Sequence, residues 1–143
     1  MKLYQCLPLV ALATLAAPAL AQDAAKGESE FRKCAACHMI VADDGTEIKR
    51  GGRTGPNLYG VVGRPIAATD FNYGDDLAAV GATGAVWDEA NLVAYVQDPS
   101  AWLKAALDDN GARSKMTFKL ARGAEDVVAY LASVAPAAAP ASE

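Results

Sequence analysis

The sequence has few of the residues from which metal sites are usually built. It contains one histidine and three cysteines among 143 residues. One of the cysteines, Cys6, lies in an apolar stretch at the N-terminus, which leaves only Cys34 and Cys37 in the rest of the chain. A structural zinc site takes four ligands, most often cysteine and histidine. The chain cannot supply such a set, and a structural zinc site is therefore not expected.

Positive charge is also in the minority. The chain has 13 lysines and arginines against 17 acidic residues, a formal net charge of −4 at pH 7. A protein that binds nucleic acid in general carries the opposite balance, so this function is excluded. No segment alternates apolar and polar residues as a β-strand does, and no internal repeat is visible. We therefore expect one all-α domain with long loops.

The N-terminus has the pattern of an export signal. Lys2 gives a positive start, residues 7–17 form an apolar run, and Ala19-Leu20-Ala21 resembles a cleavage site. The run is too short to span a membrane, so we expect no membrane anchor. The expected organisation is a signal peptide cleaved after Ala21 (residues 1–21), a single domain (22–134) and a flexible Ala/Pro-rich tail (135–143).

The most informative segment is Cys34-Ala35-Ala36-Cys37-His38. Two cysteines three positions apart, followed at once by histidine, form the c-type haem attachment signature. Two thiols on one helical turn can bond to the two vinyl groups of a haem, while His38 offers a ring nitrogen to the iron. Because both remaining cysteines belong to this motif, no structural disulfide is expected.

The same pair of cysteines has alternative uses. A redox dithiol normally lies in a βαβ pattern, which is absent here, and half of a zinc site would lack its other ligands. One covalently attached haem c is therefore the favoured interpretation. A neutral imidazole binds iron best when its other N–H has an acceptor, and we expect the backbone carbonyl of Pro56 to be that acceptor. The ring of proline makes it a stiff carrier for such a carbonyl.

The second axial ligand is predicted by elimination. With one histidine, ligation by two histidines is excluded. Of the three methionines, Met1 belongs to the predicted signal peptide, and Met39 is too close to His38 to reach the other face of the ring. Only Met116 remains. It lies in a polar, loop-like segment, where a lone apolar side chain is more readily explained as a ligand than as a filler of the core. His/Met ligation saturates the iron and raises its reduction potential, which favours electron transfer over reaction at the metal. We therefore expect an electron carrier, not an enzyme.

Caps and helical spacing also predict the main elements. Asp23, Asp88 and Asp98 are expected to begin helices, and Asp108-Asp109-Asn110-Gly111 is expected to form a turn. The predicted helices cover residues 23–37, 88–98, 99–107 and 122–134, with a loop over 39–54 and a turn over 55–60 that leads into a short helix.

Several blocks, in this order, resemble the class I c-type cytochromes, and among them the bacterial cytochrome c2 type. The blocks are residues 31–38, 54–64, Trp87, Tyr95 and residues 115–118. The resemblance implies helices and long loops wrapped around one haem, with Gly27 and Phe31 of the first helix against Tyr130 of the last. The haem environment that it implies comprises Pro56, Arg64, Tyr73, Trp87, Tyr95 and Phe118.

Within that environment the resemblance implies separate roles. Trp87 and Arg64, with Tyr73, would hold a haem propionate, since a buried carboxylate needs donors. Tyr95 would lie beside the Met116 sulfur. Ordinary core packing is the alternative for each aromatic residue.

The resemblance further implies a monomeric periplasmic protein that shuttles single electrons. Its donor would be a quinol-oxidising cytochrome bc complex, and its acceptor a photosynthetic reaction centre or a terminal oxidase. A haem enzyme, a subunit of one enzyme complex and a thiol oxidoreductase remain as alternatives.

Basic residues offer a way to dock despite the acidic net charge. Residues 113–122 contain four basic residues and no acidic one, and further basic residues flank the attachment motif. We hypothesise a basic ring around an exposed haem edge that steers an acidic partner face, although unrelated solvated charges would give the same pattern. The proposed ring comprises Arg32, Lys33, Arg53, Arg113, Lys115, Lys119 and Arg122.

Overall fold

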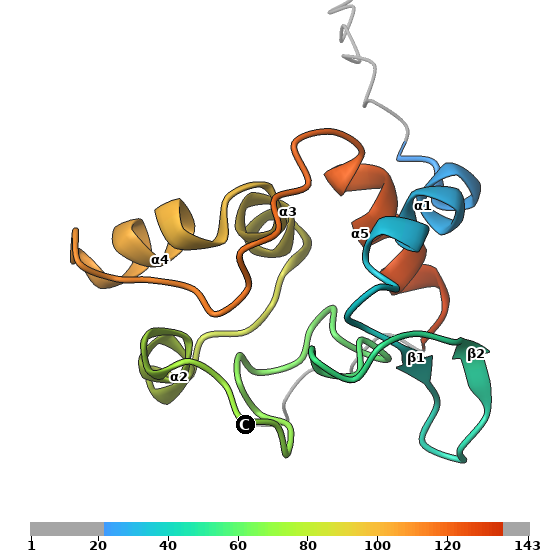
Figure 1. Cartoon of the computed structure of the whole chain (residues 1–143), viewed down its shortest axis with the longest axis horizontal. Coiled ribbons are helices and arrows are strands. Elements are labelled where there is room, and N and C mark those ends of the chain that lie inside the picture. The colour runs from blue at the N-terminus through green and yellow to red at the C-terminus, as the bar shows by residue number, and fades with distance from the viewer. Residues whose placement is uncertain (1–21, 136–143) are drawn as a thin grey trace, which may run out of the picture.

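The computed structural model describes residues 22–135, so the predicted signal peptide and all but the first residue of the predicted tail lie outside it. Five α-helices, one short 3₁₀ helix and a two-stranded ribbon make up the described chain (Figure 1). No helix within these residues is long and apolar enough to cross a bilayer. The elements are α1 (Ala24–Glu30), η1 (Phe31–Lys33), β1 (Ile40–Val41), β2 (Glu47–Lys49), α2 (Asp75–Ala82), α3 (Glu89–Gln97), α4 (Pro99–Leu107) and α5 (Ala124–Ser133).

The first and last helices, α1 and α5, lie side by side (Figure 1). Gly27 makes their close approach possible, because a Cβ atom there would collide with the backbone of Asp126. One turn on, the rings of Phe31 and Tyr130 pack with their centroids 5.8 Å apart. The predicted packing of Gly27 and Phe31 against Tyr130 is confirmed.

A carboxylate joins the starts of the same two helices. Asp126, in the first turn of α5, accepts a hydrogen bond from the backbone N–H of Asp23 at 3.0 Å. Its other oxygen lies 2.7 Å from the Lys26 ammonium. Asp23 itself caps α1, as predicted, by accepting from the N–H of Lys26. The ends of the folded domain are thus tied together by polar bonds as well as by apolar packing.

Helices α3 and α4 follow each other almost without a break. Asp88 caps α3, and Asp98 both ends α3 and caps α4, accepting a hydrogen bond from the N–H of Ala101. Pro99 occupies the first position of α4, where its missing N–H costs nothing. These boundaries agree with the prediction.

The prediction was wrong in five places. Helix α1 ends at Glu30, and the chain continues through η1 and a turn up to Cys37. The predicted loop over 39–54 contains the ribbon β1–β2, whose strands are too short to show alternation. The turn over 55–60 leads into further turns and not into a helix. Helix α2 was missed, since its cap Gly74 offers no side-chain signal. The last helix also begins at Ala124, two residues later than expected.

Candidate haem site

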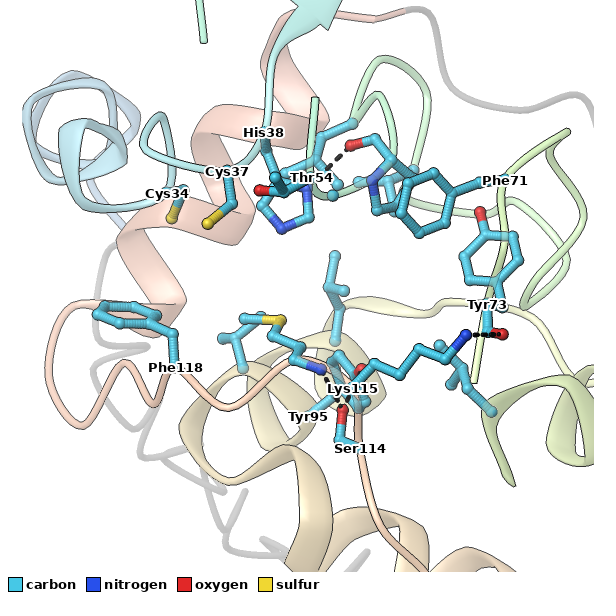
Figure 2. Close-up of a pocket in the computed structure, with 18 of the residues that line it drawn as sticks. Cys34, Cys37, His38, Thr54, Phe71, Tyr73, Tyr95, Ser114, Lys115 and Phe118 are labelled. Carbon is cyan, nitrogen blue, oxygen red and sulfur yellow. Dashed lines mark hydrogen bonds between the residues drawn. The ribbon is translucent and has the colours of Figure 1, made fainter. Parts of the chain in front are cut away.

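The helices and the long loops enclose a cavity of about 530 Å³ (Figure 2). This volume lies within the range of sites that enclose cofactors. Four separate parts of the chain line it: the attachment motif, residues 54–58, residues 71–74 and residues 113–118. Helix α3 and helix α5 supply apolar side chains, namely Leu92, Tyr95, Val96, Val127 and Leu131. The cavity is therefore mainly apolar, and its polar groups come from loops.

The His38 imidazole points into the cavity (Figure 2). Its Nδ1 lies 2.8 Å from the backbone carbonyl oxygen of Pro56, so the predicted hydrogen bond is present. Burial lowers the pKa of His38, although the bond to Pro56 acts in the opposite direction. Behind the ring lies Gly55, where a Cβ atom would collide with the imidazole. The result is a neutral, oriented ring whose Nε2 is available as a metal ligand.

The two thiols lie on the same wall as His38 (Figure 2). Cys34 is half-buried, and burial raises the pKa of its thiol to about 11, whereas Cys37 is exposed. The loop after the ribbon packs directly on this turn, since the N–H of Gly52 donates to Ala35 and that of Gly55 donates to Cys37, both at 2.9 Å. The motif is thus held by backbone bonds from two glycines, whose close approach leaves no room for a Cβ atom.

Met116 lines the cavity from residues 113–118, a segment that crosses it opposite His38 (Figure 2). Ser114 shapes this segment. Its Oγ accepts a hydrogen bond from the N–H of Met116 at 3.1 Å and shares one with the Tyr95 hydroxyl at 3.0 Å. The N–H of Ser114 donates to the Ser100 hydroxyl at 3.2 Å. Tyr95 therefore fixes the Met116 segment through Ser114, while a contact with the Met116 sulfur stays a prediction.

Three further predicted residues, Arg64, Tyr73 and Trp87, line the same cavity. Arg64 donates to the carbonyl oxygens of Tyr59 at 3.1 Å and Asn57 at 3.3 Å. Burial lowers the pKa of Arg64, yet the guanidinium remains charged, and it has no ion-pair partner among the described residues. A half-buried cation of this kind favours a bound anion.

The aromatic residues of this region form a cluster. The Trp87 ring packs 4.9 Å from Tyr95 and 5.3 Å from Trp102, measured between centroids. No hydrogen bond among the described residues uses the Trp87 indole N–H, so it is available to a ligand. The Tyr73 hydroxyl bonds to Thr69. Phe118 is 43% exposed at the cavity rim, across from the two cysteines (Figure 2).

The seven predicted docking residues differ in their surroundings. Lys33 pairs with Glu30, and Lys119 lies 2.6 Å from Asp98. Arg32 donates to the carbonyl of Ser29, and the Lys115 ammonium donates to the carbonyls of Asn72 and Tyr73 and to the Asn72 side-chain oxygen. Three members, Arg53, Arg113 and Arg122, are exposed and make neither an ion pair nor a side-chain hydrogen bond among residues 22–135.

Only part of the predicted ring lies at the cavity. Lys33, Arg113 and Lys115 line it, while the other four do not. Sequence analysis also missed Ser114 and Phe71, which both belong to the site. A hydroxyl residue two positions before Met116 was the available signal for Ser114, and none pointed to Phe71.

The residues of this cavity fit a haem. Its walls are apolar, two thiols flank a neutral imidazole, and Arg64 with the Trp87 N–H offers donors for carboxylates. Within residues 22–135, no group of three or more His, Cys, Asp or Glu side chains could hold a metal ion. A zinc site at Cys34 and Cys37 would therefore lack its remaining ligands among these residues.

No family model matches the chain. The sequence is 56% identical over 135 residues to cytochrome c2 of Rhodobacter capsulatus, a match that covers 94% of this chain and 98% of that protein. It is 55% identical over 132 residues to cytochrome c-550 of Paracoccus denitrificans, covering 89% and 85%. The solved structure of cytochrome c2 from Rhodobacter capsulatus aligns with a TM-score of 0.77 at 58% identity, covering 78% of this chain and 97% of that one. Ferric cytochrome c-550 from Paracoccus versutus aligns with a TM-score of 0.79 at 55% identity, covering 81% and 100%.

Proposed function

The chain belongs to the class I c-type cytochromes, most like cytochrome c2, and carries one covalently bound haem c; on that premise we propose a soluble one-electron carrier with His38 and Met116 as axial ligands. One observation carries the ligand assignment. His38 lines the cavity from the attachment motif, and Met116 lines it from residues 113–118. These two parts of the chain face each other across the cavity. When bound, haem c supplies an iron that gains or loses one electron.

Four side chains would hold the cofactor. Cys34 and Cys37 would form the thioether bonds, which fix the haem plane beside the attachment turn. His38 would give its Nε2 to the iron, while its Nδ1–H donates to Pro56 and keeps the ring from rotating. Met116 would supply a thioether, a soft and neutral ligand that favours the reduced state.

This ligand set supports electron transfer over catalysis. If His38 and Met116 both bind the iron, oxygen or peroxide would find no free site on it. Both ligand segments are also held by hydrogen bonds, His38 through Pro56 and Met116 through Ser114. The surroundings therefore need little rearrangement when the charge changes.

The propionates would lie near Arg64, Trp87 and Tyr73. The Arg64 guanidinium is half-buried, and only backbone carbonyls share its donors. A carboxylate beside it would gain a charge-assisted hydrogen bond and would relieve the cost of burying the cation.

The cellular setting that we propose is based on the relationship of the chain to cytochrome c2. We propose export by residues 1–21, cleaved after Ala21, with residues 22–134 as the cytochrome domain and 135–143 as a tail. The protein would act as a monomer in the periplasm. It would accept electrons from a cytochrome bc complex and deliver them to a photosynthetic reaction centre or a terminal oxidase, docking through basic residues near the cavity rim.

Optical spectra of the purified protein in both oxidation states test this proposal. We expect a low-spin iron in both states and no rapid binding of carbon monoxide by the reduced protein. A high-spin iron at neutral pH, or fast carbon monoxide binding, would contradict the assignment of Met116. Cell fractionation tests the location, and recovery of the protein from the cytoplasm with residues 1–21 still attached would contradict export.

A further inference from the structure

Lys115, the residue before Met116, reaches back across the cavity rim (Figure 2). Its ammonium lies 2.9 Å from the carbonyl oxygen of Tyr73, and 3.3 Å from both the carbonyl and the side-chain oxygen of Asn72. An ammonium has three donors, and three oxygens surround this one. These partners are 42 and 43 positions away in the sequence, so the bonds join segments that are otherwise unrelated.

The aliphatic part of the Lys115 side chain packs closely against Gly74. A Cβ atom at Gly74 would come within 3.2 Å of the Lys115 Cγ. A second bond joins the same parts of the chain, since the N–H of Arg113 donates to Asp76 Oδ2 at 2.7 Å. Residues 113–115 and 72–76 are thus connected at two points.

Both connected segments line the cavity. Residues 112–123, which carry Met116, contain no helix or strand. The position of Met116 therefore depends on bonds from neighbouring segments: Ser114 provides them on the side of α3 and α4, and Lys115 provides them on the side of residues 72–74.

We propose that Lys115 is a positioning residue, whose side chain forms a strap between residues 72–74 and the Met116 segment and so strengthens the hold of Met116 on the iron. This inference rests on the proposed axial role of Met116. It gives the Lys115 ammonium a role within the chain, because three neutral oxygens already accept its hydrogen bonds.

Competition by imidazole for the iron of the ferric holoprotein tests the strap. Lys115→Met keeps most of the stem and removes the ammonium. Loss of charge-assisted bonds at an exposed site should lower the imidazole concentration needed to displace Met116 by about fivefold or more. Lys115→Arg keeps a charged donor and should recover part of this loss. Lys104→Met, which removes an exposed lysine outside the cavity, is the matched control and should behave as wild type.

Two further measurements separate the outcomes. Amide hydrogen exchange over residues 72–74 and 113–118 should become faster in Lys115→Met but not in Lys104→Met. An imidazole affinity of Lys115→Met within twofold of wild type would overturn the strap. A weaker salt dependence of partner association in the same variant would then show that Lys115 acts as a docking charge. A high-spin wild-type protein would instead refute the proposed function, and the inference with it, before any variant was made.

Discussion

The His38 imidazole and the Pro56 carbonyl form a fixed pair, with 2.8 Å between Nδ1 and the oxygen. The bond leaves Nε2 as the only ring nitrogen available to a metal. Gly55 completes the arrangement, because its missing side chain makes room for the ring. The orientation of the proposed ligand therefore depends on two residues that carry no metal-binding group.

Gly55→Ala should disturb this pair. The added methyl group cannot fit unless the ring moves and weakens its bond to Pro56. We expect a loss of about 1–3 kcal/mol in the free energy of unfolding, typical of overpacking, together with an altered spectrum. Gly45→Ala is the control, because a Cβ there meets nothing within 4 Å and the φ of +87° adds only backbone strain. Its spectrum should not change, and a wild-type spectrum for Gly55→Ala would contradict the prediction.

Met116→Ala should leave the haem attached but open one side of the iron. Without the thioether the reduction potential should fall by something on the order of 0.1 V, a modest part of the range that axial ligands cover. A redox titration and carbon monoxide binding to the reduced protein measure the two effects. Met39→Ala is the comparison, since Met39 does not line the cavity. If Met116→Ala kept both the potential and the spectrum, another residue would be the ligand.

Asp126 predicts a pH dependence of stability. The hydrogen bond from Lys26, and then that from the backbone of Asp23, lower the pKa of Asp126 below 3.8. Because the folded-state pKa is lower than the unfolded one, the stabilisation is complete above the unfolded value and is lost as pH falls through it towards the folded value. Asp126→Asn should therefore unfold more easily at pH 7 and approach wild type near pH 3, measured by denaturant titration.

The exposed Asp43→Asn is the control for that measurement. It removes one carboxylate without touching the contact between α1 and α5. An Asp126→Asn variant whose deficit stayed constant from pH 7 to pH 3 would show that the carboxylate charge does not matter there.

Arg113 is the best test of steering. Its side chain lines the cavity, lies exposed and has no ion-pair partner among the described residues. Arg113→Gln should slow association with an acidic electron-transfer partner several-fold at low salt, more than Lys104→Gln does. The difference should disappear as the Debye length falls from about 30 Å at 0.01 M salt to about 8 Å at 0.15 M. Rates that do not change with salt in the wild type would refute steering.

The sequence predicted those parts of the site for which only one or two residue types are chemically suitable and the chain contains few of them. A single histidine leaves no choice of imidazole, and elimination leaves Met116 as the candidate sulfur. The Pro56 acceptor followed from the need of the ring for a partner, and the structure contains that bond. The packing of Gly27 and Phe31 against Tyr130 followed from the family resemblance, whereas the close approach of Gly27 to the backbone of Asp126 is seen only in the structure.

The missed parts depend on contacts between distant segments. Helix α2 begins at Gly74 without a side-chain cap, and the acidic pair Asp75 and Asp76 in its first turn was the one local signal for it. Lys115 appeared to be one more surface charge, because two of its three acceptors are backbone oxygens and all three lie 42 or 43 positions away. Backbone acceptors are present at every residue, and only the fold selects which of them a lysine reaches.

The joining of α1 to α5 has a consequence for how the protein is made. Asp23 and Asp126 are 103 positions apart, so a chain that emerges with its amino end first exposes the attachment motif long before the last helix can close on α1. Until α5 is in place, the part of the cavity wall that Val127 and Leu131 supply is missing. We therefore expect the cavity to be most accessible to the cofactor before α5 has packed on α1.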